Sequence, residues 1–84
     1  MNDRLIVRGY VRDLLDQTGD RNGFADSDSL VMSGRLDSVD TLQLVMFLED
    51  KYGVDFADRG FDKNELDSLD SIMSLIGAIR GASR

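Results

Sequence analysis

Residues 34–53, GRLDSVDTLQLVMFLEDKYG, decide the fold of this chain. Positions 38–52 contain no Gly or Pro and are rich in Leu, Gln, Met and Glu, which favour a helix. Asp37 is a good N-cap, because its carboxylate can accept a hydrogen bond from the free N–H groups of the first turn, and Asp40 follows three residues later. Gly53 ends the run. The stretch therefore predicts a helix from Ser38 to Tyr52 that begins on a serine.

Helical spacing at about 100° per residue gives this helix one broad apolar face and one polar arc. The apolar face is expected to hold Leu42, Leu44, Val45, Leu48 and Tyr52. The polar arc is expected to hold Asp40, Gln43, Asp50 and Lys51, with Phe47 in its middle and Val39 and Met46 at its edge. An aromatic ring in a polar arc is either covered by a neighbouring loop or binds a partner. Both interpretations of Phe47 stay open.

Two further helices are predicted outside this stretch. Apolar residues recur in steps of three and four from Asp3 to Gln17, and again from Ser68 to Arg80, which indicates one buried face on each helix. Residues 19–37 are rich in Gly, Asp, Ser and Asn and predict a long loop. A short helical turn is expected near Phe61 and Leu66, which should contact the core. The sequence thus predicts an all-α bundle of three main helices and one short helix.

Composition limits the chemistry of the chain. The 84 residues are expected to form a single domain, 1–84, with one modest core. The sequence has no Cys and no His, so it lacks thiolates, the commonest general base and the commonest zinc ligand. The Asp-rich loop lacks the glycine and glutamate that a calcium-binding loop needs at its sixth and twelfth positions. We therefore expect a non-catalytic protein with no metal site.

The net charge of −6 limits the partners of the chain. An acidic protein repels nucleic acid and anionic membrane surfaces, so neither is expected as a partner. The apolar runs are far too short to span a bilayer, and no signal peptide is recognised, so a cytoplasmic monomer is expected. The charge serves either solubility alone or attraction to a partner with a basic surface. Composition does not separate these two interpretations.

The motif Asp37-Ser38-Val39-Asp40 carries the chemistry. A phosphodiester on Ser38 would be stabilised by the unpaired N–H groups and the dipole of the helix start. Asp37 stands where a modifying enzyme can use a carboxylate to orient the serine or a metal ion, and Gly34 lets the loop bend. The pattern recurs once, at residues 67–70, but without a preceding glycine and after a short loop. Ser68 is therefore interpreted as a helix cap and Ser38 as a modification site.

Residues 37–49, DSVDTLQLVMFLE, resemble the modification site and second helix of acyl carrier proteins. The likeness extends from about Leu30 to Ile79. It implies an acyl-carrier-like four-helix bundle in which Ser38 receives 4′-phosphopantetheine from coenzyme A, flanked by Asp37 and Val39. The thiol of that arm would carry an acyl group as a thioester. The implied partners are a phosphopantetheinyl transferase, an acyl- or amino-acid-loading ligase or transferase, and downstream acyl-processing enzymes.

Two features differ from fatty-acid carriers. Arg35 and Leu36 separate Gly34 from Asp37 where fatty-acid carriers have one residue, and with residues 61–63 this resembles D-alanyl and other aminoacyl carrier proteins. Gln43 stands where an acidic residue is common. The cargo stays open between fatty acyl, aminoacyl and polyketide-like groups.

The resemblance also implies a docking face on the Ser38–Tyr52 helix. Its expected members are Asp40, Gln43, Met46, Phe47 and Asp50. The alternative is a small acidic helical protein-interaction domain that never receives a prosthetic group. A carboxylate enzyme is a third class, but no convergent pair of carboxylates can be placed in a cleft from the sequence.

Overall fold

The structure is a computed structural model that describes residues 3–56, 60 and 62–82. These residues contain helices and no strand, and the helices are α1 (Asp3–Gln17), α2 (Ser38–Tyr52), the 3-10 helix η1 (Lys63–Leu66) and α4 (Leu69–Ala82). The predicted all-α bundle is confirmed, and α1 and α2 have the predicted bounds. The predicted core contact at Phe61 lies outside the described residues. None of the described helices has the length and apolar content needed to cross a bilayer.

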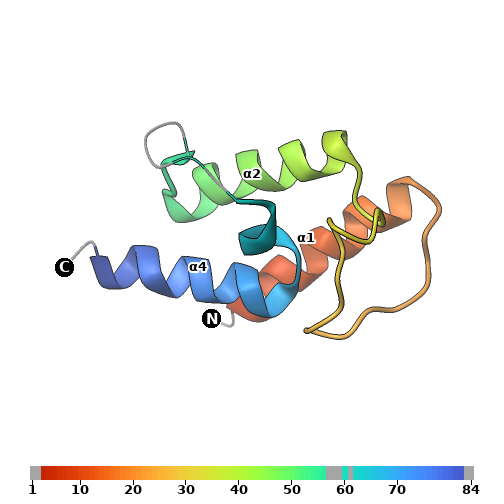
Figure 1. The fold of residues 1–84 in the computed structure, drawn as a ribbon, viewed down its shortest axis with the longest axis horizontal. Coiled ribbons are helices and arrows are strands. Elements are labelled where there is room, and N and C mark those ends of the chain that lie inside the picture. Colours follow the sequence, from red (N-terminus) through yellow and green to blue (C-terminus); the bar gives the residue numbers. More distant parts are fainter. Residues whose placement is uncertain (1–2, 57–59, 61, 83–84) are drawn as a thin grey trace.

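The helices pack around α1. α1 contacts both α2 and α4, and η1 lies against α4 (Figure 1). The long loop from residue 18 to residue 37 leaves the end of α1 and returns to the start of α2. Ser38 therefore lies where this loop meets the bundle.

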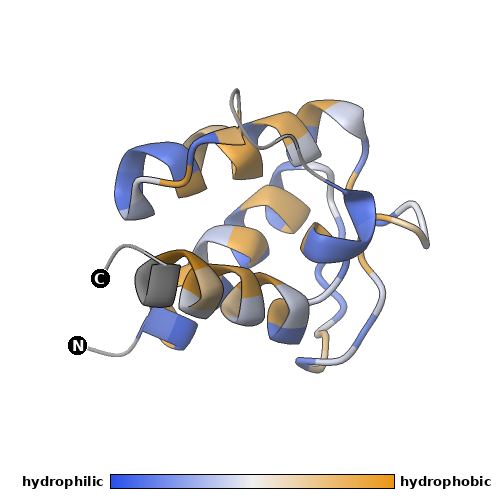
Figure 2. Ribbon diagram, turned by 60° about the vertical axis from the view of Figure 1, so that its left-hand side comes forward, coloured by the Kyte–Doolittle hydropathy of each residue, from blue (hydrophilic) through white to orange (hydrophobic). Residues whose placement is uncertain are grey.

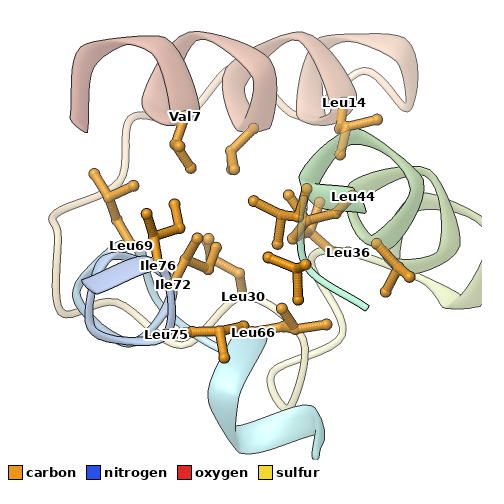
Figure 3. Close-up of a cluster of buried hydrophobic side chains, with 14 of the residues drawn as sticks. Val7, Leu14, Leu30, Leu36, Leu44, Leu66, Leu69, Ile72, Leu75 and Ile76 are labelled. Atoms are coloured by element: carbon orange, nitrogen blue, oxygen red, sulfur yellow. The ribbon is translucent and has the colours of Figure 1, made fainter. Parts of the chain in front are cut away.

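The core consists of apolar side chains from α1, α2, η1, α4, the long loop and the segment that follows α2. Figure 3 shows these side chains converging between the helices. The loop contributes Phe24, Leu30 and Leu36, which are at most 9% exposed, so the loop is held by its apolar residues. Full burial of one such side chain contributes about 1.5–3 kcal/mol. The largest fully buried side chains are Leu14, Leu15, Leu30, Leu36, Leu44, Leu48, Leu66, Leu69, Ile72, Ile76, Val7 and Val11.

Ion pairs hold the first half of the loop against α1. Arg8 pairs with Asp26, donates to the Phe24 carbonyl oxygen at 3.0 Å and lies over the Phe24 ring. Arg4 also pairs with Asp26, at 2.7 Å. Two arginines one helical turn apart thus form ion pairs with the same loop carboxylate.

A single aspartate holds the second half of the loop. The Asp67 carboxylate accepts hydrogen bonds from Val31 N at 3.0 Å, Met32 N at 2.7 Å and Ser29 Oγ at 3.0 Å. Its carbonyl oxygen accepts a fourth, from Leu30 N at 2.7 Å. Burial alone would raise the pKa of Asp67, but these hydrogen bonds together lower it below its ordinary value. We call this arrangement the Asp67 clamp.

We expect Asp67→Ala to lower the free energy of unfolding by about 1.5–3 kcal/mol, because hydrogen bonds to a charged group are strong and their loss frees the loop. Urea denaturation followed by circular dichroism measures the change. Asp70→Ala is the matched control: Asp70 pairs with Arg4 at 2.9 Å, but its side chain is 53% exposed, so its loss should cost at most about 1 kcal/mol. Equal losses in the two variants would contradict the clamp.

Candidate functional site

Ser38 is exposed and is the first residue of α2. The N-cap Asp37 accepts a hydrogen bond from Asp40 N at 2.8 Å through its carboxylate, and from Thr41 N at 2.9 Å through its carbonyl oxygen. None of the described residues forms a hydrogen bond with the Ser38 hydroxyl. The first turn is thus tightly capped, while the serine hydroxyl stays available to a reagent.

A groove of ≈ 580 Å³ opens beside Ser38. Val31, Leu36 and Leu42 supply apolar wall, and Lys63 of η1 supplies a positive charge. The local sequence around Ser38 carries no signal for Lys63, which reaches the site only through the packing of η1. A second groove, of ≈ 440 Å³, lies between η1 and α4 and contains none of the predicted site residues. No cluster of three or more His, Cys, Asp or Glu within the described ranges is arranged to hold a metal ion.

The outer face of α2 carries an apolar stripe, of which the helical wheel placed Val39 and Met46 at the edge of the polar arc but Leu42 on the core face. Val39 is 63% exposed, and Leu42 and Met46 are each 58% exposed. Their spacing of three and four residues places them on one side of the helix. Placing Leu42 on the core face was therefore wrong. Hydrophobic residues run along most of α2 (Figure 2). Their distribution around the helix axis therefore does not identify the side that packs against the core.

The position of Asp40 also differs from the one predicted. The wheel put it on the polar arc, but it is only 3% exposed, and its Oδ2 atom has no hydrogen-bond partner. Burial raises the pKa of Asp40, and the nearby negative charge of Asp37 adds to the rise. A buried carboxylate cannot meet a partner enzyme at the surface, so Asp40 does not belong to an exposed docking face.

Phe47 is half-buried and packs against the core. Its ring stacks on Tyr10 of α1, with centroids 4.0 Å apart, and contacts Tyr52 edge-on at 6.2 Å. The Tyr10 hydroxyl donates to the Gln43 carbonyl oxygen at 3.2 Å. Phe47 thus joins α2 to α1, and the covered interpretation holds, although the cover is a helix rather than a loop. Gln43 itself is half-buried, and Asp50 is exposed near the far end of α2.

Ser68, in the second copy of the motif, has a different environment. It is 9% exposed, and its hydroxyl oxygen accepts a hydrogen bond from Ser71 N at 3.1 Å. This is the bond of a helix cap to the first turn of α4. The interpretation of Ser68 as a cap is confirmed.

Comparison with known proteins finds similar chains over nearly the whole length. A D-alanyl carrier protein of Lacticaseibacillus rhamnosus is 34% identical over 77 residues, which cover 90% of this chain and 95% of the relative. A D-alanyl carrier protein of Lacticaseibacillus casei (strain BL23) is 31% identical over 77 residues, with the same coverage. No protein-family model matches the chain, and no solved structure matches it significantly.

We expect Asp40→Asn to raise Tm at pH 7, because it removes a buried charge. The folded-state pKa of Asp40 is raised above the ordinary 3.8, so the folded protein binds this proton more tightly than the unfolded chain does. Wild-type stability therefore falls as the pH rises through the folded pKa, and the variant should lack this fall. The two proteins should converge below pH 3.8. A gain of about 1 kcal/mol corresponds to about 4–8 °C in a domain of this size.

Calorimetry from acidic to neutral pH measures the difference between the two proteins. Asp50→Asn, which changes an exposed carboxylate of the same helix, serves as the control and should leave Tm nearly unchanged. If Asp40→Asn instead lowers Tm by the same amount at every pH, the buried charge is not destabilising.

Proposed function

The chain belongs to the carrier protein family of the D-alanyl carrier proteins, and from that premise we propose that it carries an acyl or aminoacyl group as a thioester on a 4′-phosphopantetheine arm attached to Ser38. The observation that carries the proposal is an exposed serine with a free hydroxyl at the start of α2, beside a groove. In this role the chain is a carrier and catalyses no step itself. It would act in the cytoplasm, where coenzyme A and ATP are available.

The start of α2 suits a phosphodiester. The first N–H groups of a helix have no partner within it, and the Asp37 carboxylate accepts a hydrogen bond from that of Asp40. The N–H groups of Ser38 and Val39 remain, together with the positive end of the helix dipole. Ser38 supplies the oxygen that would be bonded to phosphorus, and its proton would leave to the transferase. When bound, the arm would supply the thiol that this cysteine-free chain lacks.

We expect coenzyme A and a broad-specificity phosphopantetheinyl transferase to add the mass of one arm to the wild type and to Ser68→Ala, but not to Ser38→Ala. Intact-mass spectrometry of the three proteins measures this. Ser68→Ala is matched in sequence context, because both serines follow an aspartate and lie at the start of a helix. Modification that persists in Ser38→Ala would place the arm elsewhere. A wild type that is never modified would favour an interaction domain without a prosthetic group.

Within the carrier role, we favour an aminoacyl cargo. The two residues between Gly34 and Asp37 support it, as do the relatives that are named D-alanyl carrier proteins. The loading partner would then be a ligase that activates an amino acid with ATP. Further enzymes would remove the aminoacyl group from the arm.

The exposed stripe of Val39, Leu42 and Met46 is the docking face that we propose for this ligase. Gln43 and the exposed Asp50 lie at its rim. The stripe begins next to Ser38, so a partner that covers it holds the serine near its own active site. Acidic side chains around the stripe and the net charge of −6 would speed the encounter with a basic partner surface. Phe47 holds α2 against α1 through its stack on Tyr10.

We expect Met46→Ser to weaken ligase binding about tenfold while leaving Tm nearly unchanged, because part of an exposed apolar side chain is covered only in the complex. Phe47→Ala should lower Tm, since it removes the stack on Tyr10. Titration calorimetry and thermal melts measure the two effects. Leu5→Ser, on α1 and 64% exposed, is the control for the loss of a surface apolar group. Unchanged affinity in Met46→Ser would exclude the stripe as the docking face.

A further inference from the structure

Lys63 lies at the groove beside Ser38, and the residues next to it in the sequence do not predict this position. It is the first residue of η1, its side chain is exposed, and it lines the same groove as Ser38. The neighbouring Asp62 is occupied with capping η1, where its carboxylate accepts a hydrogen bond from Asn64 N at 2.9 Å. None of the described carboxylates pairs with the Lys63 ammonium group. An available cation thus borders the groove that opens at the serine.

The charges around Ser38 call for such a cation. Asp37 lines the groove, and the buried Asp40 lies one turn behind it. A phosphodiester on Ser38 would add a negative charge beside these carboxyl groups. Arg35 is near in sequence, but its guanidinium is bound to the Asp20 carboxylate at 2.9 Å and 3.2 Å and to the Asn22 carbonyl oxygen at 2.8 Å. Lys63 is the cation that lines the groove within the described residues.

We propose that Lys63 binds the phosphodiester of the arm and thereby directs the arm along the groove between α2 and η1. The proposal rests on the proposed function, because it needs the arm on Ser38. An ammonium group attracts a phosphodiester as a point charge and needs no fixed geometry, which suits a flexible arm. Val31, Leu36 and Leu42 then offer apolar wall to the rest of the arm.

The lysine content of the chain makes the contact measurable. Lys51 and Lys63 are the only lysines in the sequence. Reductive methylation with ¹³C-formaldehyde keeps the charge of each amine and gives one dimethylamino NMR signal per lysine. Lys51 is in the last turn of α2, about 20 Å from Ser38 at 1.5 Å per residue, which exceeds the Debye length of about 10 Å at 0.1 M salt. Lys51 is therefore an internal control.

Conversion of the full chain from the apo to the holo form should shift the Lys63 signal and leave the Lys51 signal in place. The shift should shrink as sodium chloride is raised toward 1 M, where the Debye length is about 3 Å. In unmethylated holo protein, Lys63→Gln should move the ³¹P signal of the arm, whereas Lys63→Arg should keep it near the wild-type position. Lys51→Gln should have no effect.

Intact mass of each sample separates the two levels of the proposal. If the mass shows the arm but the Lys63 signal does not move, or if Lys51→Gln moves the ³¹P signal as much as Lys63→Gln does, the Lys63 contact is wrong and the carrier function stands. If the mass shows no arm on the wild type, both proposals fail. A Lys63 shift that is confined to the holo form and is sensitive to salt supports the contact.

Discussion

The rest of the site depends on the hydrogen bonds that the Asp67 carboxylate accepts. They come from two backbone N–H groups and one hydroxyl of residues 29–32, far away in the sequence. This fastens the loop to the segment between η1 and α4, so that Leu30 and Leu36 enter the core. Leu36 N also donates to the Leu30 carbonyl oxygen at 2.8 Å, which closes the loop just before α2. The position of Ser38 follows from this closure, because the helix begins two residues later.

The same fastening builds the groove beside the serine. Val31 and Leu36 come from the clamped loop, Leu42 comes from α2, and Lys63 comes from η1. No single element contains the groove, so its shape depends on the core that holds these elements together. A chain of this size has one such core, and loss of the clamp would release the loop that supplies Val31 and Leu36 to the groove and leads into Ser38. Stability and function are therefore linked through the loop rather than through α2 alone.

The environment of α2 explains why two similar motifs have different roles. Ser38 and Ser68 both follow an aspartate and both lie at a helix start, Ser38 as the first residue of α2 and Ser68 just before α4. Ser68 is buried and uses its hydroxyl oxygen to cap α4, whereas at α2 the aspartate does the capping and leaves the serine hydroxyl free. A hydroxyl that is needed to hold a helix start is poorly available for modification. The difference lies in which side chain satisfies the first-turn N–H groups.

The sequence by itself determined the helices and the position of Ser38. Caps, left-handed glycines and periodic apolar residues act over a few neighbours, so α1 and α2 could be predicted with their observed bounds, and α4 within two residues. Only the tertiary structure decided which side of α2 is covered. Val39, Leu42 and Met46 make the outer side of this helix nearly as apolar as its inner side, so the direction of burial depends on where α1 packs. In the packed structure Asp40 is buried, Leu42 is exposed and Phe47 stacks on Tyr10 of α1. The packing of η1 brings Lys63 to the groove beside Ser38. No local sequence pattern predicts this, because the two residues are far apart in the chain.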